Sequence, residues 1–185
     1  MATLTTPKTW ADGDIPDWKE FGTEIFGLLD HLYKPPTCWI RANSSTSLTN
    51  GVFVPIVMNL VVTDMTGVDA MFNPAQPTRV TPKMQGRYII YYGASWDNVA
   101  CGCSGRRIAL LKKNGTTWWS DKLDERAGSS VLAFKVSEGL TSYMYFNGTT
   151  DYVELYQYTD GGTVSNGNAS DGWYSSIYVR WVSRV

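Results

Sequence analysis

The sequence predicts a mainly β fold, in which an antiparallel sandwich, jelly roll or closed barrel follows an extended arm and one short amphipathic helix. Three observations lead to this prediction. From residue 37 onward, apolar and polar residues alternate in short runs separated by turn-forming residues. No helical periodicity lies between these runs. Aromatic residues make up 14% of the 185 residues, a content that suits sheets and buried interfaces.

The N-terminal region, residues 1–36, reads differently and is predicted to be a docking arm followed by a helix. Residues 1–9 are small and polar, and the acidic residues and Pro16 that follow are typical of a helix start. Lys34-Pro35-Pro36 ends the helix. Between this start and this end, apolar residues recur at alternating steps of three and four. The residues of this seam are Trp18, Phe21, Ile25, Leu28 and Leu32.

A helix of about 17 residues is marginal alone in water, so this seam must be buried. It packs either on its own domain or against identical helices or a docking partner, and the proline break favours the second interpretation. We therefore assign oligomerisation or docking to the seam and to Trp10. Residues 1–36 carry a net charge of −3, against +2 for residues 37–185.

Residues 37–185 form the predicted β domain, in which about eight strands are expected. Pro55 places the first of them at a sheet edge or bulge. Asn114-Gly115 predicts a type I′ hairpin turn, and residues 160–172 predict a loop. The expected strands are residues 52–57, 87–92, 107–112, 117–119, 131–136, 142–146, 152–158 and 173–182.

The composition of the chain argues against several classes of function. A net charge of −1 gives no excess of positive charge that would attract nucleic acid or anionic lipid. The apolar runs are far shorter than the roughly 18 residues that span a membrane, and no secretory signal is visible. We therefore expect no nucleic-acid and no membrane partner.

The chain offers little for catalysis or metal binding. Cys38, Cys101 and Cys103 lack the spacing of a zinc site, and His31 is the single histidine. We expect no metal, no cofactor and no catalytic residue.

A glycoside hydrolase with paired carboxylates is the enzyme alternative. The acidic cluster that it needs lies beside Lys122 and Arg126 in a predicted loop. We interpret this segment as a solvated turn in which the two basic residues offset the acidic charges. That cluster is Asp121, Asp124 and Glu125. Glu138 and Glu154 show no sign of convergence, so we expect a non-enzymatic protein.

The order of the β-strand motifs resembles the C1q/TNF-like jelly rolls over about residues 52–182. Two departures are Thr150, where the family has glycine, and a closing strand without the usual F-x-G-x-L form. The resemblance implies a jelly-roll sandwich and a homotrimer. The matching motifs are Met58-Asn59, Phe72-Asn73-Pro74, Val80-Thr81-Pro82, Gly86-Arg87-Tyr88, Leu111-Lys112-Lys113-Asn114-Gly115, Asp151-Tyr152-Val153-Glu154-Leu155 and Trp173-Tyr174 before Ile177-Tyr178-Val179.

A second resemblance concerns the N-terminus. Residues 6–14, TPKTWADGD, followed by an amphipathic helix, look like the start of many tailed-bacteriophage virion proteins. This implies a virion component that is assembled in the host cytoplasm and contacts other virion proteins. A minor tail protein is the preferred interpretation, and a capsid decoration or head-fibre protein is the alternative.

Aromatic residues of the β domain leave two questions open. Tyr88, Tyr152 and Tyr156 belong either to the core or to a trimer contact. Near loops, aromatic rings could also stack on sugars in a module for host attachment that binds a surface glycan or protein. The candidates for such ligand-facing rings are Trp118, Trp119 and Trp173.

Overall fold

The structure, a computed structural model, describes residues 34–44, 47–65, 69–97, 105–125, 134–140, 143–160, 164–166 and 174–184. The chain divides into two units, Met1–Pro36 and Thr37–Val185. The predicted arm and helix lie outside the described residues. For residues 97, 105, 117–125, 134–140 and 164–166 the description covers the backbone.

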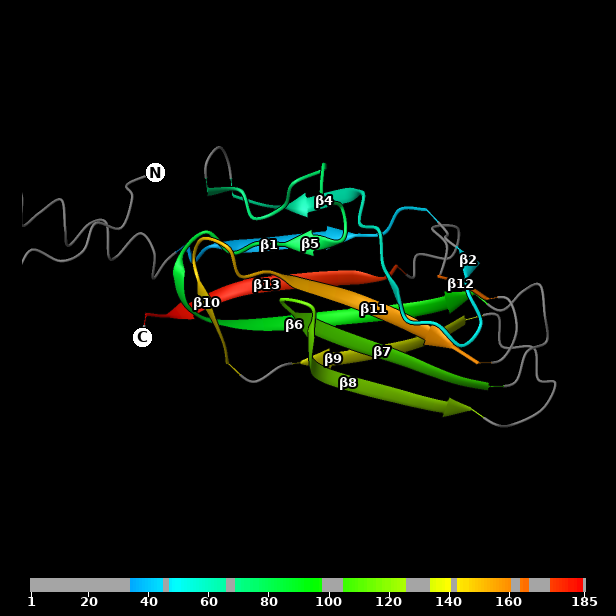
Figure 1. Cartoon of the computed structure of the whole chain (residues 1–185). Helices are drawn as coiled ribbons and strands as arrows, with labels where there is room; N and C mark the ends of the chain where they lie inside the picture. Colours follow the sequence, from blue (N-terminus) through cyan, green and yellow to red (C-terminus); the bar gives the residue numbers. More distant parts are fainter. Residues whose placement is uncertain are drawn as a thin grey trace, which may run out of the picture. The chain divides into compact units, whose positions relative to one another are not determined.

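The second unit is a jelly-roll sandwich of two antiparallel sheets (Figure 1). The larger sheet follows the order β2-β12-β6-β13-β1-β4, and β9 and β10 also pair with β6. Its strands are β1 (Thr37–Arg41), β2 (Ser47–Leu48), β4 (Leu60–Thr63), β6 (Gln85–Asp97), β9 (Phe134–Leu140), β10 (Met144–Asn147), β12 (Val164–Asn166) and β13 (Ser176–Ser183).

The smaller sheet follows the order β3-β11-β7-β8, with β5 also paired to β11. Its strands are β3 (Val54–Pro55), β5 (Arg79–Val80), β7 (Gly105–Lys113), β8 (Thr116–Glu125) and β11 (Val153–Thr159). Strands far apart in sequence are neighbours in both sheets, as in β1–β13 and β11–β7. This connectivity confirms the predicted jelly-roll sandwich rather than the closed-barrel alternative.

The core lies between the sheets, because each strand turns alternate side chains inward. Ile177, Val179 and Trp181 of β13 are buried, whereas Arg180 between them is exposed. Tyr88 is fully buried and meets Phe146 edge-on at 5.4 Å between ring centroids. Its hydroxyl donates to the Met84 carbonyl at 2.8 Å, so a polar tip is satisfied inside an apolar body. The core interpretation of Tyr88 is therefore confirmed.

Hydrogen bonds between buried polar groups connect the two sheets inside this core. The amide nitrogen Nε2 of Gln157, on β11, donates to the Ser95 carbonyl of β6 at 2.8 Å and approaches Ser175 Oγ at 3.3 Å. All three residues are buried. A buried amide costs free energy unless it is paired. These bonds pair the Nε2 donor of Gln157 across the two sheets, whereas its Oε1 has no hydrogen-bond partner among the described residues.

The predicted strands are found, with different lengths. β3 is a two-residue edge strand, in agreement with the expectation from Pro55. β6 extends to 13 residues. Residues 121–125 continue strand β8, so the prediction of a loop for the acidic cluster is wrong. β12 lies within the predicted loop 160–172, and β1, β2, β4 and β5 were not predicted at all.

Two Asn-Gly pairs make different turns. Asn114 and Gly115 have φ of 51° and 77°, which confirms the type I′ hairpin between β7 and β8. Gly148 also has a positive φ of 78°. It does not close a hairpin, because β10 pairs with β6 while β11 pairs with β7 in the other sheet. Asn147-Gly148 therefore turns the chain from one sheet to the other.

Candidate functional site: the outer face of the larger sheet

The larger sheet carries a cluster of aromatic and arginine side chains on the side that faces away from the core. Cys38, Ile40, Ile90 and Val179 point inward, so their strand neighbours point outward. We call this surface the arginine–aromatic face. It consists of Trp39 and Arg41 on β1, Arg87, Ile89 and Tyr91 on β6, Tyr178 and Arg180 on β13, and Tyr143 and Tyr145 at β10.

One row of rings crosses three neighbouring strands of this face. Tyr178 lies opposite Trp39 on one side and opposite Tyr91 on the other. The Tyr91 and Tyr178 ring centroids are 5.9 Å apart. The Arg41 guanidinium lies 4.2 Å from the Trp39 ring centroid and 5.5 Å from that of Tyr174. These contacts hold the side chains in place before any partner binds.

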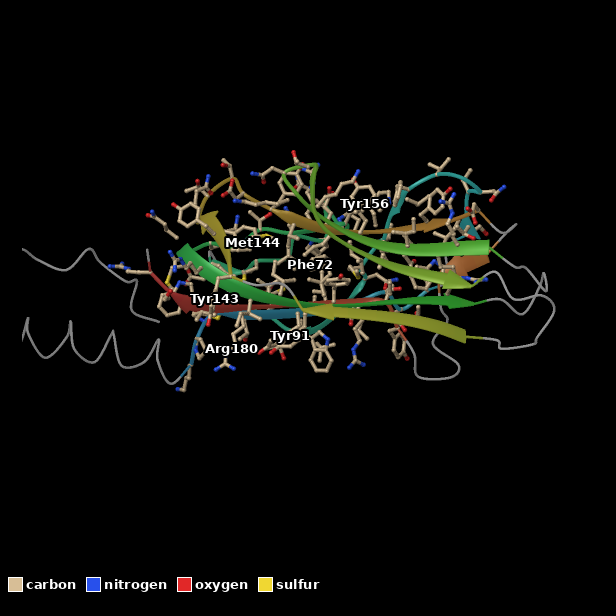
Figure 2. All side chains as sticks on the ribbon, turned by 90° about the horizontal axis from the view of Figure 1, so that it is seen from below. Phe72, Tyr91, Tyr143, Met144, Tyr156 and Arg180 are labelled. Atoms are coloured by element: carbon tan, nitrogen blue, oxygen red, sulfur yellow. The ribbon has the colours of Figure 1, made fainter. Side chains whose placement is uncertain are left out.

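The face is open in the single chain. Tyr91 is 48% exposed and Tyr143 58% exposed. Figure 2 shows Tyr91, Tyr143 and Arg180 on one side of the sandwich, Phe72 and Met144 between the sheets, and Tyr156 on the opposite side.

The composition of this face is that of a protein–protein interface. Tyr, Trp and Arg are enriched at the centres of such interfaces, whereas Lys, Asp and Glu are depleted. Among the side chains described on β1, β6, β10 and β13, the outward set holds three Arg, one Trp and three Tyr, and it holds no Lys, Asp or Glu. A solvated sheet face would carry charges of both signs.

The outer face of the smaller sheet has a different character. Glu154 is 4% exposed, and its Oε1 accepts from Thr78 Oγ1 at 2.8 Å and Arg79 Nε at 3.1 Å. The Arg79 guanidinium lies 4.0 Å from the Tyr152 ring centroid, and Lys112 Nζ lies 4.0 Å from that of Tyr156. Burial and the neighbouring Glu154 raise the pKa of Tyr156. Tyr152 and Tyr156 thus lie outside the core cluster, and each ring is in a cation–π contact, with Arg79 and Lys112 respectively.

The flank formed by β3, β4 and the chain between them exposes apolar side chains. The segment 52–63 contains no charged residue, and β4 ends the larger sheet. Its exposed members are Val52, Phe53, Val57, Leu60, Val61 and Val62. This flank is continuous with the arginine–aromatic face, because Thr63 lies opposite Trp39.

Cys38 and Asp64 are neighbouring titratable groups in the described part of the chain. No group of three potential metal-ligating residues occurs in the described ranges. Cys38 is buried, and burial together with the nearby Asp64 carboxylate raises the pKa of its thiol. That carboxylate in turn accepts from the backbone amides of Met65, Met71 and Phe72. In the part of the chain that is described, no helix is long and apolar enough to cross a membrane.

The residues predicted for docking and ligand binding are not brought together by the described part of the chain. Trp118 and Trp119 lie on the edge strand β8, and Trp173 lies outside the described residues. The docking set, Trp10, Trp18, Phe21, Ile25, Leu28 and Leu32, also lies outside them.

Sequence reasoning missed the arginine–aromatic face, although a signal for it existed. In Ser-Ile-Tyr-Val-Arg-Trp, residues 176–181, Tyr178 and Arg180 share the face opposite to Ile177 and Val179. Large aromatic and arginine residues on the solvent side of a strand indicate a contact surface.

Neither a protein family nor a curated protein matches the sequence. Solved structures do. The globular domain of zebrafish complement 1qA protein matches with a TM-score of 0.55 and 16% identity, over 81% of this chain and 99% of that one. Eiger TNF from S. frugiperda matches with a TM-score of 0.51 and 10% identity, over 81% and 95%. The vertex protein P5 of phage PRD1 matches with a TM-score of 0.51 and 13% identity, over 80% and 97%.

These similarities confirm the C1q/TNF-like jelly roll that the motif order predicted. At 10–16% identity they establish the fold alone.

Proposed function

We propose that the protein is a non-enzymatic structural component of a bacteriophage virion. Three copies associate through the arginine–aromatic face, and the jelly rolls project outward while the N-terminal segments dock on the particle. The observation that carries the proposal is this face, a surface of interface composition on a fold that is similar to a phage vertex protein as well as to C1q and TNF domains.

Self-association fits the energetics of the face. Its aromatic rings bring large apolar area at low entropic cost, and each buried Trp or Tyr contributes on the order of 150–250 Å². A closed ring of identical copies covers such a face on every copy, whereas an open arrangement leaves one exposed. The homotrimer is the ring that the C1q/TNF-like resemblance implies.

The N-terminal segment supplies the attachment in this proposal. The seam from Trp18 to Leu32, with Trp10 before it, would bundle with its symmetry mates and contact a tail protein, as the opening TPKTWADGD suggests. The capsid is the alternative location, and the likeness to a vertex protein supports it.

Deleting residues 1–36 in the phage tests the attachment. We expect the shortened protein to be absent from purified particles while it still accumulates in the infected cell. Circular dichroism of the purified shortened protein controls for folding and should show a β spectrum. Immunogold labelling of normal particles then distinguishes tail from capsid. Incorporation of the shortened protein at normal copy number would show that the segment does not dock.

A further inference from the structure

Two arginines lie side by side at the centre of the arginine–aromatic face. Arg180 on β13 is directly opposite Ile89 on β6. Arg87, two residues from Ile89 on the same strand, is opposite Ser183, because the ladder shifts register between Trp181 and Ser183. Diagonal neighbours of this kind on one face of an antiparallel pair are about 7–8 Å apart at Cα, within reach of long side chains. Both arginines are exposed. Two guanidinium groups can therefore approach one ligand from adjacent strands.

The described carboxylates around this pair are either distant or already bonded. The Asp151 carboxylate accepts from the Asn147 amide of β10, close to Tyr145, but it also accepts from Asn114 and pairs with Lys113. In the described backbone of the larger sheet the acidic residues are Asp97 and Glu138, and Glu138 is paired with Gly93. Gly93 is six residues from Arg87, or about 20 Å along an extended strand. Asp64 follows β4, but its carboxylate is occupied by three backbone amides. The sheet thus places two like charges together with no described carboxylate beside them that lacks other partners.

Aromatic side chains surround the pair. Tyr145 is opposite Arg87 in the β10–β6 register, and Tyr143 precedes Met144, which is opposite Tyr88. Tyr91 and Tyr178 form the next row of the face. When a partner covers these rings, water leaves the guanidinium groups, and burial of a charge without a counter-charge is strongly unfavourable. Burial of the face therefore requires an acceptor with negative charge.

We propose that Arg87 and Arg180 form an oxyanion-binding site, which takes a carboxylate or a phosphate through the planar forks of the two guanidinium groups. The inference rests on the proposed function, because burial of the face between copies is what makes the anion necessary. The oxyanion is either free in solution or a carboxylate of the neighbouring copy.

The test uses the full chain and inorganic phosphate, with sodium chloride adjusted to keep the ionic strength constant. The unfolding midpoint and the light-scattering mass are followed against phosphate concentration. The variants are Arg87→Gln and Arg180→Gln, and Lys83→Gln is the matched control, since Lys83 is exposed and lies just before β6. We expect saturable stabilisation that weakens by about tenfold or more in apparent affinity in either arginine variant and is unchanged in the control.

The outcomes separate the two sources of the oxyanion. A phosphate-dependent rise of the midpoint that requires both arginines indicates a free anion. A phosphate-dependent loss of trimer mass that requires both arginines indicates competition with a carboxylate of the neighbouring copy. No arginine-dependent effect of either kind overturns the site. A monomeric chain that still binds phosphate through both arginines keeps the site and rejects the proposed trimer.

Discussion

Asp151 shows how a single residue holds the turns at one end of the sandwich together. Its carboxylate accepts from Asn114 Nδ2 at 2.7 Å and from the Asn147 backbone amide at 3.0 Å, and it lies 3.2 Å from Lys113 Nζ. Burial alone would raise its pKa, but these hydrogen bonds and the lysine charge outweigh burial, and the net pKa is lowered. One carboxylate thus links the β7–β8 hairpin to the β10–β11 turn.

Asp151→Asn should lower the free energy of unfolding by about 1–3 kcal/mol near neutral pH, because it removes a charged acceptor that three groups share. A lowered pKa means that the stabilisation is present above the ordinary value of 3.8 and is lost as pH falls through the lower folded value. The variant should therefore lose part of the acid dependence below about pH 4. Urea unfolding at a series of pH values measures both effects.

Asp160→Asn is the matched control for this prediction. The pKa of Asp160 is also lowered, by its bonds to Arg106, but that ion pair lies at the surface, with the arginine side chain 52% exposed. Surface pairs contribute little because water and salt screen them. An equal loss of stability in the two variants would contradict the role given to Asp151.

At the scale of elements, the turns and the edge strands decide the topology. The turn at Gly148 takes the chain from β10 in the larger sheet to β11 in the smaller one, while the turn at Asn114-Gly115 keeps β7 and β8 in one sheet. An ideal Cβ at Gly148 would lie 2.5 Å from Gln85 N and 2.9 Å from Met84 C, so the glycine is needed for close backbone packing as well as for its positive φ.

Gly148→Ala should therefore cost more stability than Gly51→Ala. Both glycines have a positive φ, of 78° and 74°, but an added Cβ at Gly51 meets nothing within 4 Å. The left-handed conformation alone costs about 1–2 kcal/mol for a non-glycine residue, and Gly148→Ala adds a backbone clash. Thermal unfolding of the two variants measures the difference. Equal midpoints would show that the backbone at Gly148 moves without cost.

Some strands could be predicted from the sequence and others could not, for physical reasons. Residues 152–158 were found because polar and apolar residues alternate along them, and residues 87–92 because five β-branched or aromatic residues follow Arg87. β4 was missed because all four of its side chains are exposed, so no alternation marks it. The acidic cluster was assigned to a loop because charge clusters favour solvent, but hairpin pairing with β7 extends β8 through it. Local composition cannot reveal such long-range pairing.

The candidate site was hidden for a related reason. The Asn114-Gly115 turn is a local signal and was predicted correctly. The arginine–aromatic face joins residues of β1, β6, β10 and β13, so it exists only once the strand order is known. Trp39 and Tyr178 are far apart in sequence and directly opposite each other in the sheet.

At the scale of the whole molecule, the two sheets present different outer surfaces. On the smaller sheet, Glu154 is satisfied by Thr78 and Arg79, and cations already cover Tyr152 and Tyr156. On the larger sheet, the arginines have no described carboxylate nearby that lacks other partners, and the rings are open. This asymmetry supports the proposal that the larger sheet is covered by a partner, and a ring of identical copies would cover it on every subunit.

Light scattering after gel filtration tests this claim most directly, with the full chain, Tyr178→Glu and the exposed-loop control Ala75→Glu. We predict a mass of about three times 20.6 kDa for the full chain and the control. Tyr178→Glu should give a mass close to that of one chain, because it removes the middle ring of the Trp39–Tyr178–Tyr91 row and replaces it with a charge that must lose its water when the face is covered. A monomeric full chain, or a Tyr178→Glu variant that remains trimeric, would contradict the assignment of this face to the trimer interface.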